Sequence, residues 1–138
     1  MNAEEAQALS EFIDTWQETA AGTRAVFLRL KTHLESQAGA AQAFKARPGV
    51  SFSLRGVCPQ DARELYVMVD VIDDDPANRW LSVCFYGEMI TDPDEQGDLI
   101  PGGLLGEDGY CFDIEENDDA LVDYLVARID EAYQSASS

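Results

Sequence analysis

The chain has 138 residues, 46% of them hydrophobic, so we expect one folded domain over residues 1–138 rather than a disordered chain. Its formal net charge is −18, from 27 acidic and 9 basic residues. A negative field of this size repels phosphate backbones and anionic lipids. It argues against direct binding of nucleic acid or membranes and favours basic protein surfaces as partners.

The negative charge is confined to one half of the sequence. Residues 1–63 contain seven acidic and seven basic residues, which cancel. From Glu64 onward there are twenty acidic residues, and only Arg79 and Arg128 oppose them, so this half carries all eighteen net charges. The sequence therefore predicts an acidic surface over the C-terminal half, and solubility alone would also account for it.

The N-terminal residues and the cysteines predict a cytoplasmic protein. The acidic segment Met1–Gln7 lacks the basic region of a signal peptide, and no apolar run approaches the ~20 residues that span a bilayer. Cys58, Cys84 and Cys111 are an odd number and form no CxxC motif. We expect free thiols in a reducing compartment.

Helical periodicity dominates the N-terminal third. A first helix is expected to begin at Asn2, which forms a capping pair with Glu5, and to end at Gly22. Thr23 is expected to cap a second helix with a four-residue apolar stripe. Pro48 ends any helical continuation, so residues 1–45 are predicted to be the helical part of the domain.

After Pro48 the hydrophobic period changes to two, which is typical of half-buried strands. Strands are predicted over residues 50–56, 65–72, 80–87 and 110–114, with a long loop over residues 88–109. Asn117 is expected to cap a closing helix over residues 117–134. The order ααββββα, with the sheet within residues 50–114, predicts an α+β two-layer sandwich: an antiparallel sheet with helices packed on one face.

The face of this sheet that points away from the helices, here called the outer face, is more apolar than solvent requires. Alternation places five large side chains on it: Tyr66, Met68, Ile72, Trp80 and Tyr86. Unless the 88–109 loop or the first helix covers them, they form a surface for a partner or for self-association.

The C-terminal third also carries a recognisable order of features: a strand ending in an aromatic residue and glycine, an apolar residue before Asp-Pro, a glycine-containing loop, a strand and a helix. The residues are Phe85, Tyr86, Gly87, Ile90, Asp92, Pro93, Gly102, Gly103, Phe112, Ile114, Leu121, Leu125, Ile129 and Ala132. This order resembles the YdhG-like domains, small bacterial proteins with an α/β sandwich fold. One branch of that family is described as a frataxin-like iron chaperone, so the resemblance implies a sandwich fold and iron handling.

Two acidic clusters are candidate sites for a hard cation such as Ca²⁺, Mg²⁺ or Fe²⁺. In "TDPDEQGD", Asp92, Asp94 and Asp98 overlay ligand positions of an EF-hand loop, but its twelfth position is Gly103 instead of Glu. The favoured interpretation is a solvated turn in which Asp92 accepts hydrogen bonds from its own backbone. The second cluster consists of Asp73, Asp74, Asp75, Glu115, Glu116 and Asp119.

No enzyme signature accompanies these carboxylates. His33 is the only histidine, and no nucleophile motif stands beside it. We therefore expect a non-enzymatic interaction domain that presents its acidic C-terminal half to a basic protein surface, without a tightly bound cofactor. The alternatives are weak divalent-metal binding connected with iron handling, and mimicry of nucleic acid by carboxylates.

Overall fold

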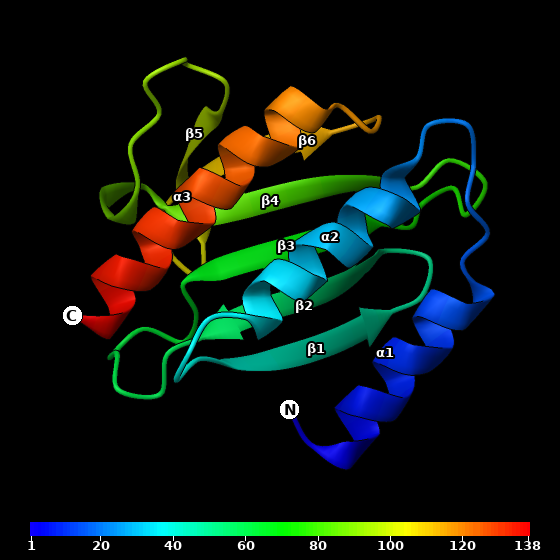
Figure 1. Cartoon of the computed structure of the whole chain (residues 1–138), viewed down its shortest axis with the longest axis horizontal. Coiled ribbons are helices and arrows are strands. Elements are labelled where there is room, and N and C mark those ends of the chain that lie inside the picture. The colour runs from blue at the N-terminus through cyan, green and yellow to red at the C-terminus, as the bar shows by residue number, and fades with distance from the viewer.

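The structure, a computed structural model, describes residues 1–138 and combines three helices with a six-stranded antiparallel sheet (Figure 1). The helices are α1 (Ala3–Thr15), α2 (Thr23–Glu35) and α3 (Asp119–Ser137). The strands are β1 (Ala41–Arg47), β2 (Ser51–Val57), β3 (Val67–Ile72), β4 (Trp80–Tyr86), β5 (Asp98–Leu104) and β6 (Glu107–Ile114), and a 3₁₀ turn, η1 (Gly87–Met89), follows β4. The strand order is β1-β2-β3-β4-β6-β5. The α+β class is as predicted, but the sheet has six strands instead of four.

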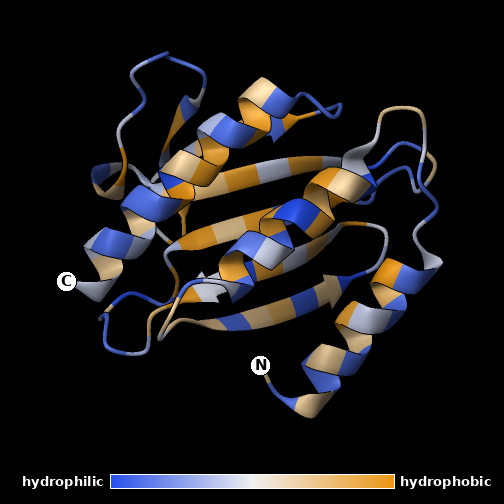
Figure 2. Ribbon diagram, in the orientation of Figure 1, coloured by the Kyte–Doolittle hydropathy of each residue, from blue (hydrophilic) through white to orange (hydrophobic).

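The helices lie on one side of the sheet, α2 and α3 across its middle and α1 beside β1 (Figure 1). Figure 2 shows hydrophobic bands recurring along the helices and strands, as expected for elements that bury one face. Val69 and Val83, on the covered face of the central strands, are fully buried, and burial of each such side chain contributes about 1.5–3 kcal/mol. None of the helices has the length and apolar character needed to cross a bilayer.

The first helix is shorter than predicted. It ends at Thr15 because Trp16 turns into extended backbone and packs its indole into an aromatic cluster. Gly22, with a φ of +75°, is the N-cap of α2, and the Thr23 hydroxyl donates to the Arg79 carbonyl at 2.9 Å instead of capping its own helix. The cluster joins α1, α2, β1 and β2 through Phe12, Trp16, Phe27, Phe44 and Phe52.

Two strands, β1 and β5, occupy segments predicted to be helix and loop. The sequence of β1, "AQAFKAR", resembles a helix, yet it pairs with β2 in full register and buries only Phe44. β5 contains Pro101 and two glycines, and its pairing with β6 shifts register between Ile100 and Leu104. Both are edge strands, where proline and irregular alternation are tolerated.

The register aligns outward-facing side chains in rows across the outer face. Because Val67, Val69 and Val71 face the helices, the residues between them face away. One row crosses five strands and consists of Lys45, Ser53, Asp70, Ser82 and Asp113. No helix lies on this side of the sheet (Figure 1).

Candidate functional site: an acidic pocket and an open sheet face

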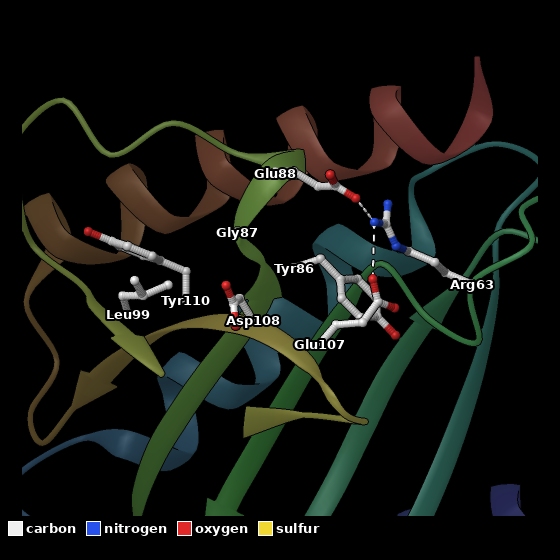
Figure 3. Close-up of a pocket in the computed structure, with 8 residues that line it drawn as sticks. All are labelled: Arg63, Tyr86, Gly87, Glu88, Leu99, Glu107, Asp108 and Tyr110. Atoms are coloured by element: carbon white, nitrogen blue, oxygen red, sulfur yellow. Dashed lines mark hydrogen bonds and ion pairs between the residues drawn. The ribbon is translucent and has the colours of Figure 1, made fainter. Parts of the chain in front are cut away.

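An open pocket of about 540 Å³ lies where β4 runs into η1 (Figure 3). Three segments distant in the sequence form it: the loop before β3, the β4–η1 junction and the β5–β6 hairpin. The pairing of Tyr86 with Gly109 brings the junction against β6. The pocket is lined by Arg63, Tyr86, Gly87, Glu88, Leu99, Glu107, Asp108 and Tyr110.

Negative charge dominates this pocket, because Glu88, Glu107 and Asp108 face only one cation, Arg63. The Arg63 guanidinium forms an ion pair with Glu88 and lies 3.4 Å from Glu107 Oε1. It also covers the Tyr86 ring, 4.7 Å from the centroid. Asp108 Oδ1 accepts a backbone N–H of the β5–β6 hairpin at 3.0 Å, which fixes the hairpin tip.

The pocket suits a guanidinium or ammonium group. Burial raises the pKa of Tyr86, the carboxylate of Glu107 raises it further and Arg63 offsets part of this, so the phenol is neutral at physiological pH. A neutral aromatic face beside carboxylates is the usual environment for a bound cation. Arg63 already adopts this binding mode within the chain: its guanidinium covers the ring and pairs with two glutamates.

The segment "TDPDEQGD" forms the turn that the sequence predicts. Asp92 accepts the backbone N–H groups of Gln96 and Gly97, each at 3.0 Å. The Tyr124 hydroxyl of α3 also donates to Asp92. The carboxylate therefore holds its own loop together and attaches that loop to α3.

This turn gives the fold a pH dependence. Burial raises the pKa of Asp92, but the hydrogen bonds from Tyr124, Gly97 and Gln96 outweigh it and hold the pKa below its ordinary value of 3.8. A carboxylate with a lowered pKa contributes stability that is present above the ordinary value and is lost as the pH falls through the lowered one.

We therefore expect Asp92→Asn to be less stable than the wild type at neutral pH, and the difference to shrink below pH 3.8. Urea unfolding followed by circular dichroism between pH about 7 and about 3 measures this. Asp94→Asn serves as the matched control, because it changes an exposed neighbour whose carboxylate accepts no hydrogen bond. A difference between Asp92→Asn and the wild type that is constant across the range would contradict the expectation.

The structure does not bring the predicted metal ligands together. Nowhere are three or more His, Cys, Asp or Glu side chains arranged to hold a metal ion. Asp75 accepts hydrogen bonds from Ala77 and Asn78 within its own turn, and Asp119 lies 3.9 Å from the Arg29 guanidinium. Asp74, Asp94, Asp98, Glu115 and Glu116 are exposed. These clusters therefore do not form a binding site for a divalent cation.

Asp73 differs from the other predicted ligands because it is buried, with 4% of its surface exposed. Its carboxylate accepts hydrogen bonds from Arg79 Nε and from the backbone N–H of Gly49, both at 2.8 Å. These bonds connect the β1–β2 hairpin to the turn between β3 and β4. Asp73 is therefore part of a structural ion pair.

Of the five aromatic and apolar residues predicted on the outer face, Met68, Ile72 and Trp80 lie there and are partly exposed. Tyr66 is on the opposite side, fully buried, where its hydroxyl donates to Gln37 Oε1 at 2.5 Å and burial raises its pKa. Tyr86 is buried under Arg63. Neither α1 nor β5 crosses this face (Figure 1), so the exposed part of the predicted surface consists of the first three residues.

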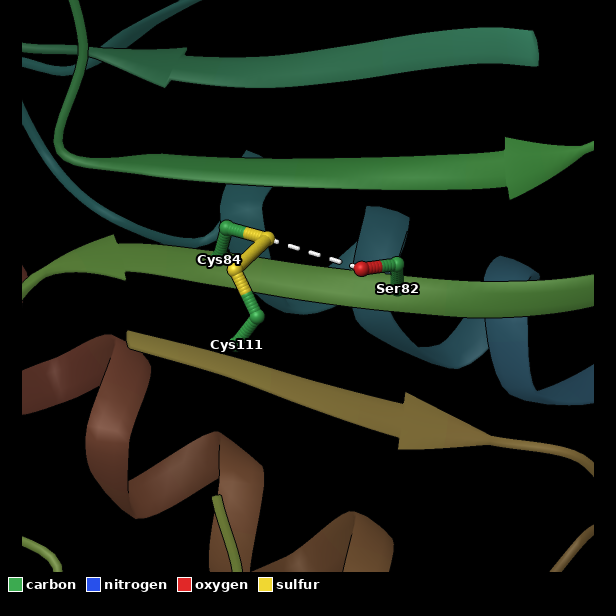
Figure 4. The surroundings of a disulfide bond; sticks show 3 residues. All are labelled: Ser82, Cys84 and Cys111. Carbon is green, nitrogen blue, oxygen red and sulfur yellow. Dashed lines mark hydrogen bonds between the residues drawn. A yellow bond between two sulfur atoms is a disulfide. The ribbon is translucent and has the colours of Figure 1, made fainter. Parts of the chain in front are cut away.

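Cys84 and Cys111 form a disulfide on the outer face, where free thiols were expected (Figure 4). They stand directly opposite each other in β4 and β6, with Cα atoms 4.2 Å apart, close to the spacing of a non-hydrogen-bonded antiparallel pair. Cys58 is the one free thiol, and burial raises its pKa. The argument from free cysteines to a reducing compartment therefore does not hold.

Among the pocket residues, sequence reasoning singles out only Tyr86, as part of the predicted partner surface, and misses the charged ones. Arg63, Glu88, Glu107 and Asp108 belong to no motif, and they meet only because three segments fold together. The one signal in the sequence that could have located the pocket is the pair of predicted strands over residues 80–87 and 110–114. Antiparallel pairing of these strands would have brought residues 86–88 near residues 107–110.

The similarity to the YdhG-like domains remains a prediction. Iron handling of the kind it implies would need gathered ligands, which the acidic clusters do not provide. Comparisons of this chain with known protein families, with curated proteins and with solved structures found no match.

Proposed function

We propose that this chain is a non-enzymatic interaction domain that binds a basic protein through its acidic C-terminal half, and that the pocket beside Arg63 receives an arginine or lysine side chain of that partner. The composition of the pocket carries the proposal: Glu88, Glu107 and Asp108 line it together with the neutral side chain of Tyr86. The pocket lies almost entirely in the half of the chain that holds all eighteen net charges.

The long-range field of the acidic half and the local charges of the pocket have different roles in this proposal. The summed field of residues 64–138 attracts a basic surface from a distance and raises the association rate. The pocket then fixes one cationic side chain by ion pairing and by contact with an aromatic face. A partner without such a side chain gains only the long-range attraction, which is weakly specific.

Arg63 has to leave the pocket, or share it, when the partner binds. Its ion pairs are solvated: the Arg63 side chain is 24% exposed, and those of Glu88 and Glu107 are 72% and 53% exposed. Each ion pair of this kind contributes about 0–1 kcal/mol and the contact with the Tyr86 ring about 0.5–1 kcal/mol, so displacing Arg63 costs up to about 3 kcal/mol, roughly a hundredfold in affinity.

The other two candidate functions lack an observation of this kind. Divalent-metal handling depends on acidic clusters whose members remain apart in the structure. Nucleic-acid mimicry depends on the net charge alone. Neither is proposed.

The test is calorimetric titration with a capped peptide of alternating arginine and glycine, compared with the same peptide carrying glutamate in place of arginine. We expect the arginine peptide alone to bind, and its affinity to fall about tenfold or more as ionic strength rises from about 0.05 M to about 0.5 M. Binding that ignores ionic strength, or equal binding of both peptides, would overturn the proposed function.

Matched variants locate the site. Glu88→Gln/Glu107→Gln and Glu115→Gln/Glu116→Gln remove the same charge from exposed positions of the acidic half, but only the first pair lines the pocket. We expect a clearly larger loss of affinity for the first pair, and tighter binding by Arg63→Ala, by up to about a hundredfold, because this variant removes the competing cation. Equal losses for the two pairs would show diffuse attraction and would overturn the assignment of the pocket.

A further inference from the structure

We infer that the outer face is a self-association surface, on which a second copy of this chain packs about a twofold axis that runs along β3. Of the residues that carry this inference, only Glu107 also lines the acidic pocket, and the test below does not change Glu107, so the inference does not depend on the proposed function. The charge, the strand register and the shape of the face support it.

The outer face is close to balanced in charge, although the whole chain carries a net charge of −18. The register places three basic residues on it, all from β1 and β2, and four acidic residues, from β3, β5 and β6. They are Lys45, Arg47, Arg55, Asp70, Asp98, Glu107 and Asp113. A face with a basic side and an acidic side is complementary to a copy of itself turned so that the two sides exchange.

Strand order selects the axis. A rotation of 180° about an axis along β3 stacks β1 on β6 of the second copy, β2 on β4 and β3 on itself. In the row described above, Lys45 then faces Asp113 of the second copy, and Ser53 faces Ser82. The other in-plane axis, perpendicular to the strands, would stack β1 on β1 and bring Lys45 against its own counterpart. Charge therefore excludes it.

The shape of the sheet permits this packing. A regularly twisted sheet is saddle-shaped, and a rotation of 180° about an in-plane axis gives a copy with the same saddle shape in the same orientation. The two sheets can therefore stack with their faces about 10 Å apart over their whole width. Small side chains, Ser53 and Ser82, flank the centre of the face, and the apolar Met68 and Ile72 lie along the axis, where each meets its counterpart. Trp80 and the Cys84–Cys111 disulfide add apolar surface beside them.

The size of the face indicates a weak dimer. Five strands at about 4.8 Å spacing and about 20 Å of strand length give roughly 500 Å² per copy, or roughly 1,000 Å² in total, at the lower end of specific interfaces. Two copies that each carry eighteen net negative charges also repel until salt screens them. Association is therefore expected at protein concentrations of tens to hundreds of micromolar and at moderate salt.

Asp70 lies at the centre of the face and would meet its own counterpart. Its Oδ1 atom is buried without a hydrogen-bond partner. Burial raises the pKa of Asp70, and Ser53 and Arg55 of β2 with Arg47 of β1 offset only part of this. On the other side its row neighbour in β4 is an uncharged serine. Two charged carboxylates here oppose association, so Asp70→Asn is expected to strengthen the dimer.

Sedimentation equilibrium of the full chain at about 0.3 M salt tests the inference. We expect a concentration-dependent dimer that Lys45→Glu and Asp113→Lys each weaken about tenfold, because either reversal turns two attractive contacts into repulsive ones. The double variant Lys45→Glu/Asp113→Lys keeps the net charge and should restore the affinity. Within one chain these residues are four strands apart, roughly 19 Å, so the rescue reports a contact between copies.

Lys31→Glu makes the same change in net charge as Lys45→Glu but lies on α2, on the other side of the sheet, and should leave the dimer nearly unchanged. A monomer at all concentrations, or a double variant no better than the single ones, overturns the inference. So does a monomer whose outer-face amide resonances shift when the arginine peptide is added, because the face would then belong to a basic partner. Loss of self-association with retained peptide binding leaves the proposed function intact.

Discussion

Replacing Asp73 with alanine should lower the free energy of unfolding by about 3–5 kcal/mol, although neighbouring Asp74 and Asp75 are exposed. The Asp73 and Arg79 side chains are 5% and 12% exposed, so their ion pair is shielded from water. Breaking a shielded pair from one side leaves a buried charge without its partner, and the cost of that charge dominates.

The surroundings of Arg79 explain why its guanidinium cannot easily turn out into solvent when Asp73 is removed. Its guanidinium lies 5.1, 5.7 and 5.5 Å from the ring centroids of Phe12, Trp16 and Phe52. Without Asp73, the cation remains against this aromatic cluster, and the backbone N–H of Gly49 also loses its acceptor. Gly49 is exposed, so water can replace the lost acceptor and the charge of Arg79 dominates the cost.

Urea unfolding at neutral pH measures the effect, with Asp74→Ala as the matched control, expected within about 0.5 kcal/mol of the wild type. Asp73→Ala/Arg79→Met should recover part of the loss, because the double change also removes the unpaired charge and keeps an apolar side chain against the rings. Equal stabilities of Asp73→Ala and Asp74→Ala would contradict the account.

The contrast between Asp73 and Asp74 shows what limits prediction from sequence here. Both stand in "DDDP" and look alike as candidate metal ligands. Only the packing of the β1–β2 hairpin against this turn gives Asp73 two partners and removes it from water. By contrast, the role of Asp92 was predictable, because its partners Gln96 and Gly97 lie within five residues along the chain.

The same distinction applies to the fold. Elements with a strong period of their own, such as α2, α3, β3 and β4, lie close to where the pattern predicts them, although Asp118 and not Asn117 caps α3. β1 has no strand period and is held in the sheet by its neighbour, so tertiary pairing overrides the local preference of Ala and Gln. β5 depends on β6 in the same way. The charged residues of the pocket were not predicted for a related reason, since Arg63 and Glu107 become neighbours only when the loop before β3 packs beside the paired β4 and β6.

Removing the Cys84–Cys111 disulfide should lower the free energy of unfolding by about 3.5 kcal/mol at 25 °C. The two cysteines are 27 residues apart, and closing a loop of that length restricts the unfolded chain by about this amount in the chain-entropy description. Unfolding curves with and without reductant measure the difference. Cys84→Ser/Cys111→Ser should match the reduced wild type and should not respond to reductant.

The thiol count gives an independent check. Denatured, non-reduced protein should show one free thiol per chain, that of Cys58. Three thiols would contradict the disulfide, and then the stability of the wild type should not depend on the reductant.

The closed loop also has a functional consequence under the proposed function. Every residue that lines the pocket, except Arg63, lies between Cys84 and Cys111. The disulfide joins β4 and β6 two positions before Tyr86 and three positions after Asp108, so it holds the two sides of the pocket in register. Reduction should therefore weaken binding of the arginine peptide under conditions where the fold remains intact, which calorimetry with and without reductant measures. Unchanged affinity in the folded, reduced protein would show that strand pairing alone maintains the pocket.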